Sequence, residues 1–590
     1  MYRRILAPLL VAALALGAVA WAQTTVEGYP GLGMVPGTPG GTLTLALDDS
    51  PPRFFYYGEI SGISQRLAMQ MFDPLIYLDL ETYDLIPGLA RDWSVSDDGL
   101  VYTLFLREGV AWHDGVPFTA EDVVFTFEQI IKNPEARAGD AATFVFSVDG
   151  QPRPVTFEAI DELTVRVTLP RPSAPFIQVV GAFYPMPKHK LLPFSVEGGA
   201  QPADINNAWP TDVDLSEVVG TGAFMLREYV PGQVVRLVRN PNYWKFDEAG
   251  TRLPYLAGLN YLIVPGTDAQ VAQFLAGNLD QLNISGAQFP DFKSRELAGA
   301  AFRVVSARAL FGSPPHLAFN FNAADPELAA LFSNVAFRQA MEYAIDRMRV
   351  IDDVYNGLAE IPGTPVAPVN GAFYEDTTGL MRMYDLEAAA AALDALGLVD
   401  TNGNGVRNIS PTRELEFTLT YGVDSTTWTD IATIVQNDFA EIGVKANLQG
   451  IPSGQLFSTG LSGDFEALFL AFGNLRDPEQ RKPIWQPGGS LYYWHRATQP
   501  AVQGEAPNFD VMADWELRLY EIFDQGTTMV DPVARAELYR EWQRINAVNV
   551  PVVMIAKPGN VGAVYGNVHN YVYSLGVNVG YNPVPFMFKR

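Results

Sequence analysis

Residues 89–128 read LARDWSVSDDGLVYTLFLREGVAWHDGVPFTAEDVVFTFE. The alternation of apolar and polar residues over Val101–Leu106 predicts a strand. His113-Asp114-Gly115 follows it as a tight turn. Thr119 is a good helix cap, and Asp122 three residues later supplies the acid of a capping box, so a helix should begin there. These signals predict a structural scaffold of turns, strand and helix, and they do not indicate a function.

The same signals recur on both sides of this stretch. Three more segments alternate like strands: Thr42–Leu47, Thr164–Leu169 and Leu415–Thr420. Four segments carry an apolar stripe at helical spacing: Asn334–Asn356, Thr429–Ile442, Ala513–Gln525 and Pro532–Val548. Because strands and helices are mixed along the whole chain, the sequence predicts an α/β fold.

Composition narrows the class of protein. The chain has 590 residues, 48% of them hydrophobic and 18% charged, which is enough for a large core and several structural units. It has no cysteine, which excludes disulfides, thiolate metal sites and thiol nucleophiles. Its net charge of −26 repels nucleic acid and anionic lipid, so no nucleic-acid partner is expected.

The first residues predict export. Arg3 and Arg4 precede an apolar run, Ile5–Val19, and Ala20-Trp21-Ala22 offers a cleavage site. The run falls short of the roughly 20 residues that span a bilayer. We therefore expect a cleaved signal peptide over 1–22 and a flexible, Gly- and Pro-rich leader over 23–41. Without a cysteine to carry lipid, the mature protein is expected to be secreted and soluble in a periplasm.

Two further segments have distinctive patterns of their own. Val219–Trp244 ends in an Asn-Pro-x-Tyr-Trp turn, and Val335–Pro368 contains an Arg-Gln-Ala helix followed by Ala-Ile-Asp-Arg. Together with Leu89–Glu128 and the C-terminal helices, they span most of the range 40–587. Together they resemble the solute-binding proteins of peptide-type ABC importers, the oligopeptide- and dipeptide-binding family (bacterial extracellular solute-binding protein family 5).

The resemblance implies the two-lobed periplasmic-binding-protein fold, with a hinge and an insertion in the first lobe. The implied divisions are 42–308 for lobe I with an inserted subdomain at about 56–180, 309–550 for lobe II, and 551–590 for the return to lobe I. The implied hinge strands are His316–Asn322 on the way out and Pro551–Lys557 on the way back.

The implied function is capture of an oligopeptide, or a similar small organic ligand, between the lobes and its delivery to an ABC permease in the membrane. Such a protein needs no cofactor and no catalytic residue, and we expect it to act as a monomer. An oligosaccharide is the alternative ligand, since several relatives of this family bind sugars.

The expected ligand contacts come from both lobes. Four aromatic residues after the first strand either form an apolar wall for the ligand or pack in the core. In the second lobe the expected loops are Tyr421–Trp428 and Phe472–Pro478. The candidate ligand-binding residues are Phe54, Phe55, Tyr56, Tyr57, Asn320, Trp428, Asn474 and His495.

One departure from the family pattern bears on the ligand. Asp477-Pro478 matches an acidic-Pro pair, but Asn474 stands where peptide binders tend to carry an aspartate for the ligand ammonium. Leu468-Phe469-Leu470 stands where an arginine often meets the peptide carboxylate. Asparagine cannot supply the charge partner that a desolvated ammonium needs, which favours a neutral ligand such as an oligosaccharide.

Other motifs predict less. Asp400–Gly405 begins like a calcium loop, but Pro411 stands at the position of the bidentate glutamate, so we expect a turn. No two of the five histidines have helical metal-ligand spacing, and no metal site is expected. A metal-chelate carrier and a secreted carbohydrate hydrolase remain alternatives; the hydrolase would need only two suitably spaced carboxylates.

Overall fold

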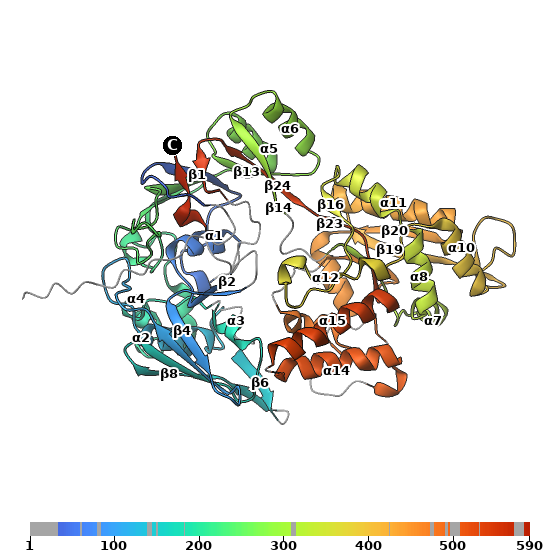
Figure 1. Cartoon of the computed structure of the whole chain (residues 1–590), viewed down its shortest axis with the longest axis horizontal. Helices are drawn as coiled ribbons and strands as arrows, with labels where there is room; N and C mark the ends of the chain where they lie inside the picture. Colours follow the sequence, from blue (N-terminus) through green and yellow to red (C-terminus); the bar gives the residue numbers. More distant parts are fainter. Residues whose placement is uncertain are drawn as a thin grey trace, which may run out of the picture.

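The computed structural model describes residues 34–58, 62–78, 84–137, 144–148, 151–181, 183–307, 314–423, 425–471, 477–489, 494–495, 508–529, 531–571 and 583–590. The predicted signal peptide and the first part of the leader lie outside these residues. The chain forms two lobes on either side of a crossover (Figure 1), and strands and helices are mixed in both, which confirms the predicted fold class.

The first sheet of lobe I has the strand order β1-β12-β11-β10. β1 (Thr42–Leu47) runs parallel to β12 (Gly258–Ile263). β11 (Val234–Arg239) and β10 (Phe224–Val230) continue the sheet in antiparallel pairing. Inward residues such as Leu43 and Leu47 are buried, so the alternation over Thr42–Leu47 predicted this strand correctly.

A second sheet of lobe I, in the order β4-β5-β9-β8, is inserted between β1 and β10. Its antiparallel strands are β4 (Ala90–Val95), β5 (Val101–Leu106), β9 (Thr164–Thr168) and β8 (Thr156–Asp161). The hairpin of β6 (Val145–Val148) and β7 (Gln151–Pro154) and the helices α2 (Ala120–Thr126), α3 (Phe176–Gly181) and α4 (Lys188–Leu191) complete the insertion. Both sheets share one hydrophobic core.

Helix α1 shifts the start of the insertion. α1 (Gly62–Met71) packs against β10, and it therefore belongs with the first sheet. The predicted subdomain at about 56–180 included this helix because nothing in its sequence marks which sheet it covers.

The quoted stretch forms the predicted elements. β5 has the predicted limits, and α2 begins after Thr119. The Asp122 carboxylate accepts the backbone N–H of Thr119 at 3.0 Å, which is one half of the capping box. It also accepts the Trp112 indole N–H at 3.3 Å and, through its other oxygen, the Lys188 backbone N–H at 2.9 Å. The cap therefore ties α2 to the start of α4.

His113 joins this stretch to the second family-like segment. Its Nδ1 accepts the Gly220 backbone N–H at 3.0 Å, and its Nε2 lies 3.1 Å from the Gly222 carbonyl oxygen. A Cβ at Gly220 would lie 1.8 Å from the Met71 carbonyl oxygen, so only glycine lets α1 pass this close. The Gly-Thr-Gly sequence is therefore a packing requirement of lobe I.

The Asn-Pro-x-Tyr-Trp turn surrounds a buried carboxylate. Asp73 accepts the Tyr243 hydroxyl at 3.0 Å and the Trp244 indole N–H at 2.7 Å. Its third donor is the Tyr77 hydroxyl, which in turn accepts a hydrogen bond from Lys245 Nζ at 2.6 Å. Burial lowers the pKa of Lys245 to about 7. This segment too has a structural role, since it satisfies a charge that the fold has taken out of water.

Lobe II is built on a five-stranded sheet in the order β20-β19-β21-β15-β22. Its strands are β20 (Lys445–Ile451), β19 (Glu416–Gly422), β21 (Ala467–Leu470), β15 (His316–Phe319) and β22 (Val552–Met554). The longest helices are α11 (Thr426–Glu441), α14 (Asp514–Thr528) and α15 (Pro532–Asn549). Pro532 is the first residue of α15, as its sequence predicts. A second hydrophobic core lies around this sheet.

The helix predicted over Asn334–Asn356 is wrong in one respect, because it is broken. α8 (Val335–Ala344) ends at Ile345, whose backbone is extended (φ −87°, ψ 116°), and α9 (Arg347–Arg349) begins after it. The Asp346 carboxylate accepts the Arg349 backbone N–H at 3.0 Å and caps the new helix. The apolar stripe continues through the break, which is why periodicity alone missed it.

A small third unit lies at the junction of the lobes. Its sheet, β13-β24-β14, is covered by α5 (Thr267–Leu275) and α6 (Phe289–Leu297) and has its own core. The strands are β13 (Gln281–Ile284), β14 (Phe302–Ala307) and β24 (Asn560–Tyr565). Figure 1 shows this unit above the crossover.

The chain crosses between lobes on either side of the predicted hinge strands. β15 and β22, predicted as hinge segments, are neighbours inside the lobe II sheet, where His316 pairs with Met554. The chain leaves β14 before it enters β15, and after β22 it returns through β23 (Lys557–Pro558) to β24. The crossover therefore lies before His316 and after Met554, closer to lobe I than predicted.

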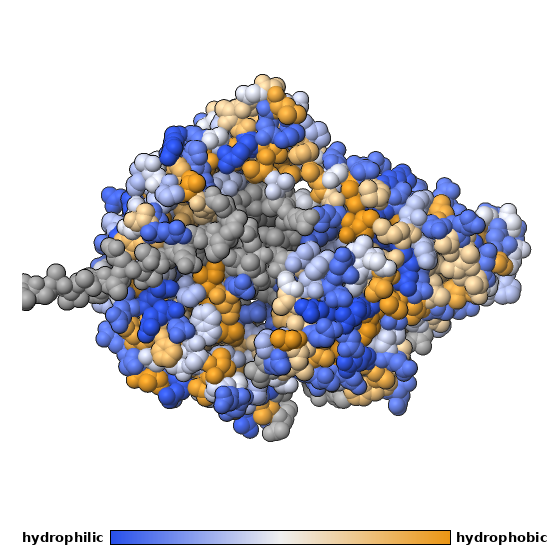
Figure 2. All heavy atoms as spheres, in the orientation of Figure 1, coloured by the Kyte–Doolittle hydropathy of each residue, from blue (hydrophilic) through white to orange (hydrophobic). Residues whose placement is uncertain are grey.

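The described part of the N-terminal leader packs on lobe I. Residues 34–41 of the predicted flexible leader lie against lobe I, where the Val35 N–H bonds to Asn570 and the Gly40 N–H bonds to Tyr255. Apolar and polar residues are interspersed on the face shown in Figure 2. None of the helices in the described part of the chain has the length and apolar character needed to span a bilayer.

We expect the two inward-facing histidines to make the fold acid-sensitive. Burial lowers the pKa of His113 and of His316 from 6.5 to about 4. The unfolded chain takes up these protons first, so the stability that neutral histidines allow is complete above pH 6.5 and falls as the pH drops towards 4. Each lost pKa unit corresponds to about 1.4 kcal/mol.

The measurement is urea unfolding at several pH values between 4 and 7. His113→Asn keeps an acceptor for Gly220 and removes the titrating group, so the stability should depend less steeply on pH than in the unchanged chain. An unchanged slope would contradict the assignment of this pH dependence to His113.

Candidate ligand-binding site

The strand directions of lobe II identify the edge of its sheet that faces lobe I. β19 runs parallel to β20 and to β21, so the carboxyl ends of all three lie at one edge. The end of β21 at Leu470 pairs with His316, where the chain arrives from lobe I, and His316 pairs with Met554, where it leaves. Open α/β sheets bind ligands outside the carboxyl ends of their strands. The candidate site is therefore this edge.

Trp428 lies next to this edge. It lies in the first turn of α11, directly after the carboxyl end of β19. Ser425 caps the helix and accepts the Trp428 backbone N–H at 3.4 Å. The half-buried indole is tilted against Phe469 of β21, with 5.9 Å between the ring centroids. An aromatic face at the end of two parallel strands suits a ligand with an apolar surface.

The aromatic residues of lobe I are buried. Phe54 contacts Tyr229 edge to face with 5.4 Å between centroids, and Phe55 contacts Trp209 at 6.1 Å. Tyr56 and Tyr57, which follow them, pack on Tyr184 by ring contact and hydrogen bond respectively. All four belong to the core of lobe I. Their packing is thus established, and contact with a ligand stays a prediction.

Asn320 holds the lobe II sheet together. It is fully buried, and its Nδ2 donates to the carbonyl oxygens of Gly463 at 2.9 Å and Phe465 at 2.8 Å. Its Oδ1 accepts the Asn322 backbone N–H at 2.9 Å. Both amide hydrogens are used in fixing β15 to the turn before β21, so its predicted role in ligand binding has no support from this geometry and stays untested.

His495 lies in the core of lobe II, beside the start of α14. Its ring is fully buried, and Nδ1 lies 3.4 Å from Glu516 Oε1. Glu516 itself caps α14 by accepting the Ala513 N–H at 2.9 Å. The imidazole therefore faces a helix cap, and its predicted ligand contact stays a prediction. Asn474 lies outside the described residues.

The acidic residue of the second predicted loop is closed off. Asp477 forms a two-point ion pair with Arg535 of α15, in which both N–O distances are 2.6 Å. The two residues are only 1% and 4% exposed. Arg535 also donates from Nε to the Gly526 carbonyl oxygen at 2.7 Å. The Asp477 carboxylate is therefore used inside lobe II and has no surface to offer a ligand ammonium.

Sequence reasoning missed Arg535 as the partner of Asp477. One signal marks it: Arg535 lies on the same face of α15 as Tyr539 and Trp542, four and seven residues later, and this face is buried. A charged residue within an apolar helical stripe predicts a buried partner.

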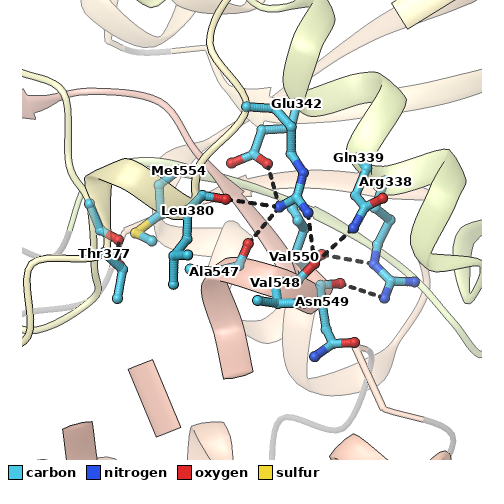
Figure 3. A network of polar contacts seen from close by, with 12 residues as sticks. Arg338, Gln339, Glu342, Thr377, Leu380, Ala547, Val548, Asn549, Val550 and Met554 are labelled. Atoms are coloured by element: carbon cyan, nitrogen blue, oxygen red, sulfur yellow. Dashed lines mark hydrogen bonds and ion pairs between the residues drawn. The ribbon is translucent and has the colours of Figure 1, made fainter. Parts of the chain in front are cut away.

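The Arg-Gln-Ala segment binds the end of α15 (Figure 3). Helix carbonyls of the last turn lack partners within the helix. Here side chains supply the donors. Figure 3 shows Gln339 and Arg338 of α8 at this end of α15: Gln339 donates to Val548 (2.9 Å), and Arg338 donates to Asn549 and Val550 (both 2.8 Å). Arg382 donates to Ala547 at 2.6 Å. Arg347 donates to the Met554 carbonyl oxygen at 2.8 Å. This arginine cluster (Arg338, Arg347 and Arg382) fixes α15 and β22 and thereby the start of the return to lobe I.

The Asp400 turn is satisfied by its own backbone. The Asp400 carboxylate accepts N–H groups from Asn402 at 3.1 Å, Gly403 at 2.7 Å and Gly405 at 2.9 Å. These bonds lower the pKa of Asp400. Within the described ranges no three histidine, aspartate or glutamate side chains gather in a way that could hold a metal ion.

Comparison with known proteins gives the family. The sequence model of the bacterial extracellular solute-binding proteins, family 5 (middle region), matches residues 84–489, more than half of the chain. The chain therefore belongs to family 5 of the bacterial extracellular solute-binding proteins, which serve ABC importers. The expectation drawn from the three family-like segments is confirmed.

Two relatives of this chain are named for different classes of ligand, a galactoside and short peptides. The periplasmic alpha-galactoside-binding protein of Rhizobium meliloti (strain 1021) is 29% identical over 512 residues, which are 82% of this chain and 71% of that protein. Di/tripeptide-binding protein 1 of Pseudomonas aeruginosa (strain UCBPP-PA14) is 26% identical over 533 residues, 87% of this chain and 88% of that protein.

Solved structures confirm the two-lobed fold. An oligopeptide-binding protein OppA has a TM-score of 0.76 at 22% identity, with coverage of 96% of this chain and 92% of that one. MelB from Agrobacterium fabrum C58, solved in complex with stachyose, has a TM-score of 0.67 at 21% identity, with coverage of 96% and 87%.

Breaking the Asp477–Arg535 pair should cost about 3 kcal/mol of the free energy of unfolding, because a buried guanidinium is left without its counter-charge. The change is Asp477→Asn, which keeps the side-chain shape, and the measurement is urea unfolding.

The matched control is Asp477→Asn with Arg535→Met, which removes both charges. Its stability should lie closer to the unchanged chain than that of the single variant. Equal losses in the two variants would show that charge compensation is not what the pair contributes.

Proposed function

We propose that this solute-binding protein captures an uncharged oligosaccharide for its importer. The observation that carries the proposal is the closure of Asp477 by Arg535, which removes the one acidic side chain of the described part of the loop after β21. In the sequence, Asn474 supplies a neutral group in the same loop. Within the described residues of the loops at this edge no free counter-charge remains, and such a surface binds a neutral ligand at lower desolvation cost than an ammonium.

The composition of the candidate edge supports the same ligand class. After β19 and β20 the described residues 421–423, 425–428 and 451–455 carry no charged side chain. Trp428 offers an aromatic face there, and sugar rings stack on such faces by their apolar C–H side. The relative named for alpha-galactosides agrees with this composition.

A short peptide is the second candidate ligand. Relatives named for dipeptides and tripeptides also cover most of this chain. Asp424, which lies outside the described residues, is an acidic residue in the Tyr421–Trp428 loop and is the group that we would expect to meet a ligand ammonium.

The remaining parts of the proposal come from the sequence. The chain is made with a signal peptide over 1–22, is released without a lipid anchor into the periplasm, and works there as a monomer. It delivers its ligand to an ABC permease, and it has no catalytic role, so a bound oligosaccharide is recovered intact.

Binding is measured by thermal unfolding and calorimetry of the mature chain, freed of any co-purified ligand, with stachyose and with trialanine as probes. A ligand at 100 times its Kd stabilises the folded state by about 2.7 kcal/mol. We expect stachyose to raise the Tm and trialanine to leave it unchanged. The opposite result would overturn the neutral-ligand proposal in favour of the peptide.

Substitution of Trp428 tests where the ligand binds. Trp428→Ala should weaken stachyose binding roughly ten-fold or more, because a central aromatic contact is worth at least about 1.4 kcal/mol. Trp428→Phe should keep most of the affinity. The control is Tyr384→Ala, an exposed aromatic elsewhere on lobe II, which should bind as the unchanged chain does. Equal affinity in Trp428→Ala would place the site away from this edge.

A further inference from the structure

A hydrogen bond joins the two lobes outside the candidate site. The backbone N–H of Ala174 in lobe I donates to the carbonyl oxygen of Thr527 in lobe II at 3.4 Å. Figure 1 shows α14 beside α3 and β6, on the side of the molecule away from β23 and β24. We call this hydrogen bond the interlobe contact. Because it lies far from the crossover, it is made or broken when the lobes rotate about the crossover.

The donor is held by a rigid loop. Ala174 lies within Pro170-Arg-Pro-Ser-Ala-Pro175, where three prolines fix the backbone. The Ser173 carbonyl oxygen accepts the Tyr102 hydroxyl at 3.0 Å and the Phe176 N–H at 3.2 Å. The loop is thus tied to β5 on one side and to α3 on the other. Because its backbone is already fixed, little conformational entropy is lost when the Ala174 N–H forms a hydrogen bond.

The acceptor is one of the carbonyls that a helix leaves without a partner. Thr527 is the second-last residue of α14, so its carbonyl oxygen has no N–H four residues later in the helix to accept. Lobe II itself supplies donors for the neighbouring carbonyls, since the Met529 N–H binds the Gln525 carbonyl oxygen at 3.0 Å and Arg535 binds the Gly526 carbonyl oxygen at 2.7 Å. The Thr527 carbonyl receives its donor from lobe I.

The same turn is connected to the loop after β21. Thr527 Oγ1 contacts the Glu479 carboxylate and accepts a hydrogen bond from Lys482 Nζ at 2.7 Å. Glu479 also accepts the Tyr539 hydroxyl at 2.8 Å. Glu479 lies two residues after Asp477, whose partner Arg535 binds the neighbouring Gly526. A shift of this loop therefore moves the acceptor of the interlobe contact.

We propose that Ala174 and Thr527 are affinity-determining residues that touch no ligand: lobe I completes the C-terminal cap of α14 in the closed form. A ligand that needs the closed form binds with an apparent Kd divided by the closed fraction. Loss of the contact should then weaken every ligand by the same factor and leave the preference between ligands unchanged. The inference does not depend on whether the ligand is a sugar or a peptide.

The test removes the donor and keeps the side chain small. Ala174→Pro lacks the N–H, and Ala174→Gly, the matched control, retains it. Spin labels at Ile160→Cys on β8 and Val533→Cys on α15 are placed on exposed residues of opposite lobes, and the chain has no other cysteine. Distances between the labels are measured in the unliganded protein, so the result is independent of the ligand's identity.

We expect Ala174→Pro to move the label distances towards longer values, and Ala174→Gly to match the unchanged chain. With stachyose or trialanine, whichever binds, the affinity should fall about 2- to 12-fold, the range for one hydrogen bond. Unchanged distances in folded Ala174→Pro would overturn the proposal.

A second measurement needs no substitution. Hydrogen exchange at the Ala174 amide of the unchanged, unliganded chain should be slower than the rate for an exposed amide, because the proton is bonded to Thr527 while the lobes are closed. Exchange at the exposed rate would overturn the proposal even if Ala174→Pro did not fold.

Discussion

The rest of the structure depends on the pairing of β15 with β22. These two strands bring the chain into lobe II and out of it side by side, as the last two strands at one edge of the sheet. Their register places the crossover at the same edge as the carboxyl ends of β19, β20 and β21. The edge from which a parallel sheet recognises ligands is therefore forced to face lobe I, whatever the loops contain.

Buried charges fix the parts that surround this edge. The arginine cluster satisfies the last carbonyls of α15 just before β22, and Arg535 neutralises Asp477 just after β21. In lobe I, Asp73 accepts hydrogen bonds from Tyr243 and Trp244 and so fixes the turn that contains them. Each pair is costly to break because its partner would be left in a medium of low dielectric. Arg338 and Arg347 of the arginine cluster lie in the family-like segment Val335–Pro368, and Arg535 lies in one of the C-terminal helices.

Much of the fold could be predicted from the sequence, and the site much less. The limits of β1 and β5 follow from strict alternation, and α15 begins at its proline. The break after Ala344 did not show, because apolar spacing reports which face is buried and is blind to a cap within the stripe. The predicted hinge segments contain β15 and β22, which lie inside the lobe II sheet, since the sequence of a strand looks the same inside a sheet and beside it.

Side-chain roles were the least predictable part. Asn320 and His495 are polar residues within apolar surroundings, a pattern shared by ligand contacts and by buried structural groups, and the structure uses both inside lobe II. The difference depends on partners far away in the sequence, such as Gly463 for Asn320, and no local pattern carries that information.

The closure of Asp477 has a consequence for how such proteins diversify. The ion pair with Arg535 anchors the loop after β21 at its far end, so α15 sets the position of that end. Substitutions earlier in the loop leave this anchor in place. The ligand preference of such a protein can thus change in evolution while the anchored end of the loop and α15 keep their places.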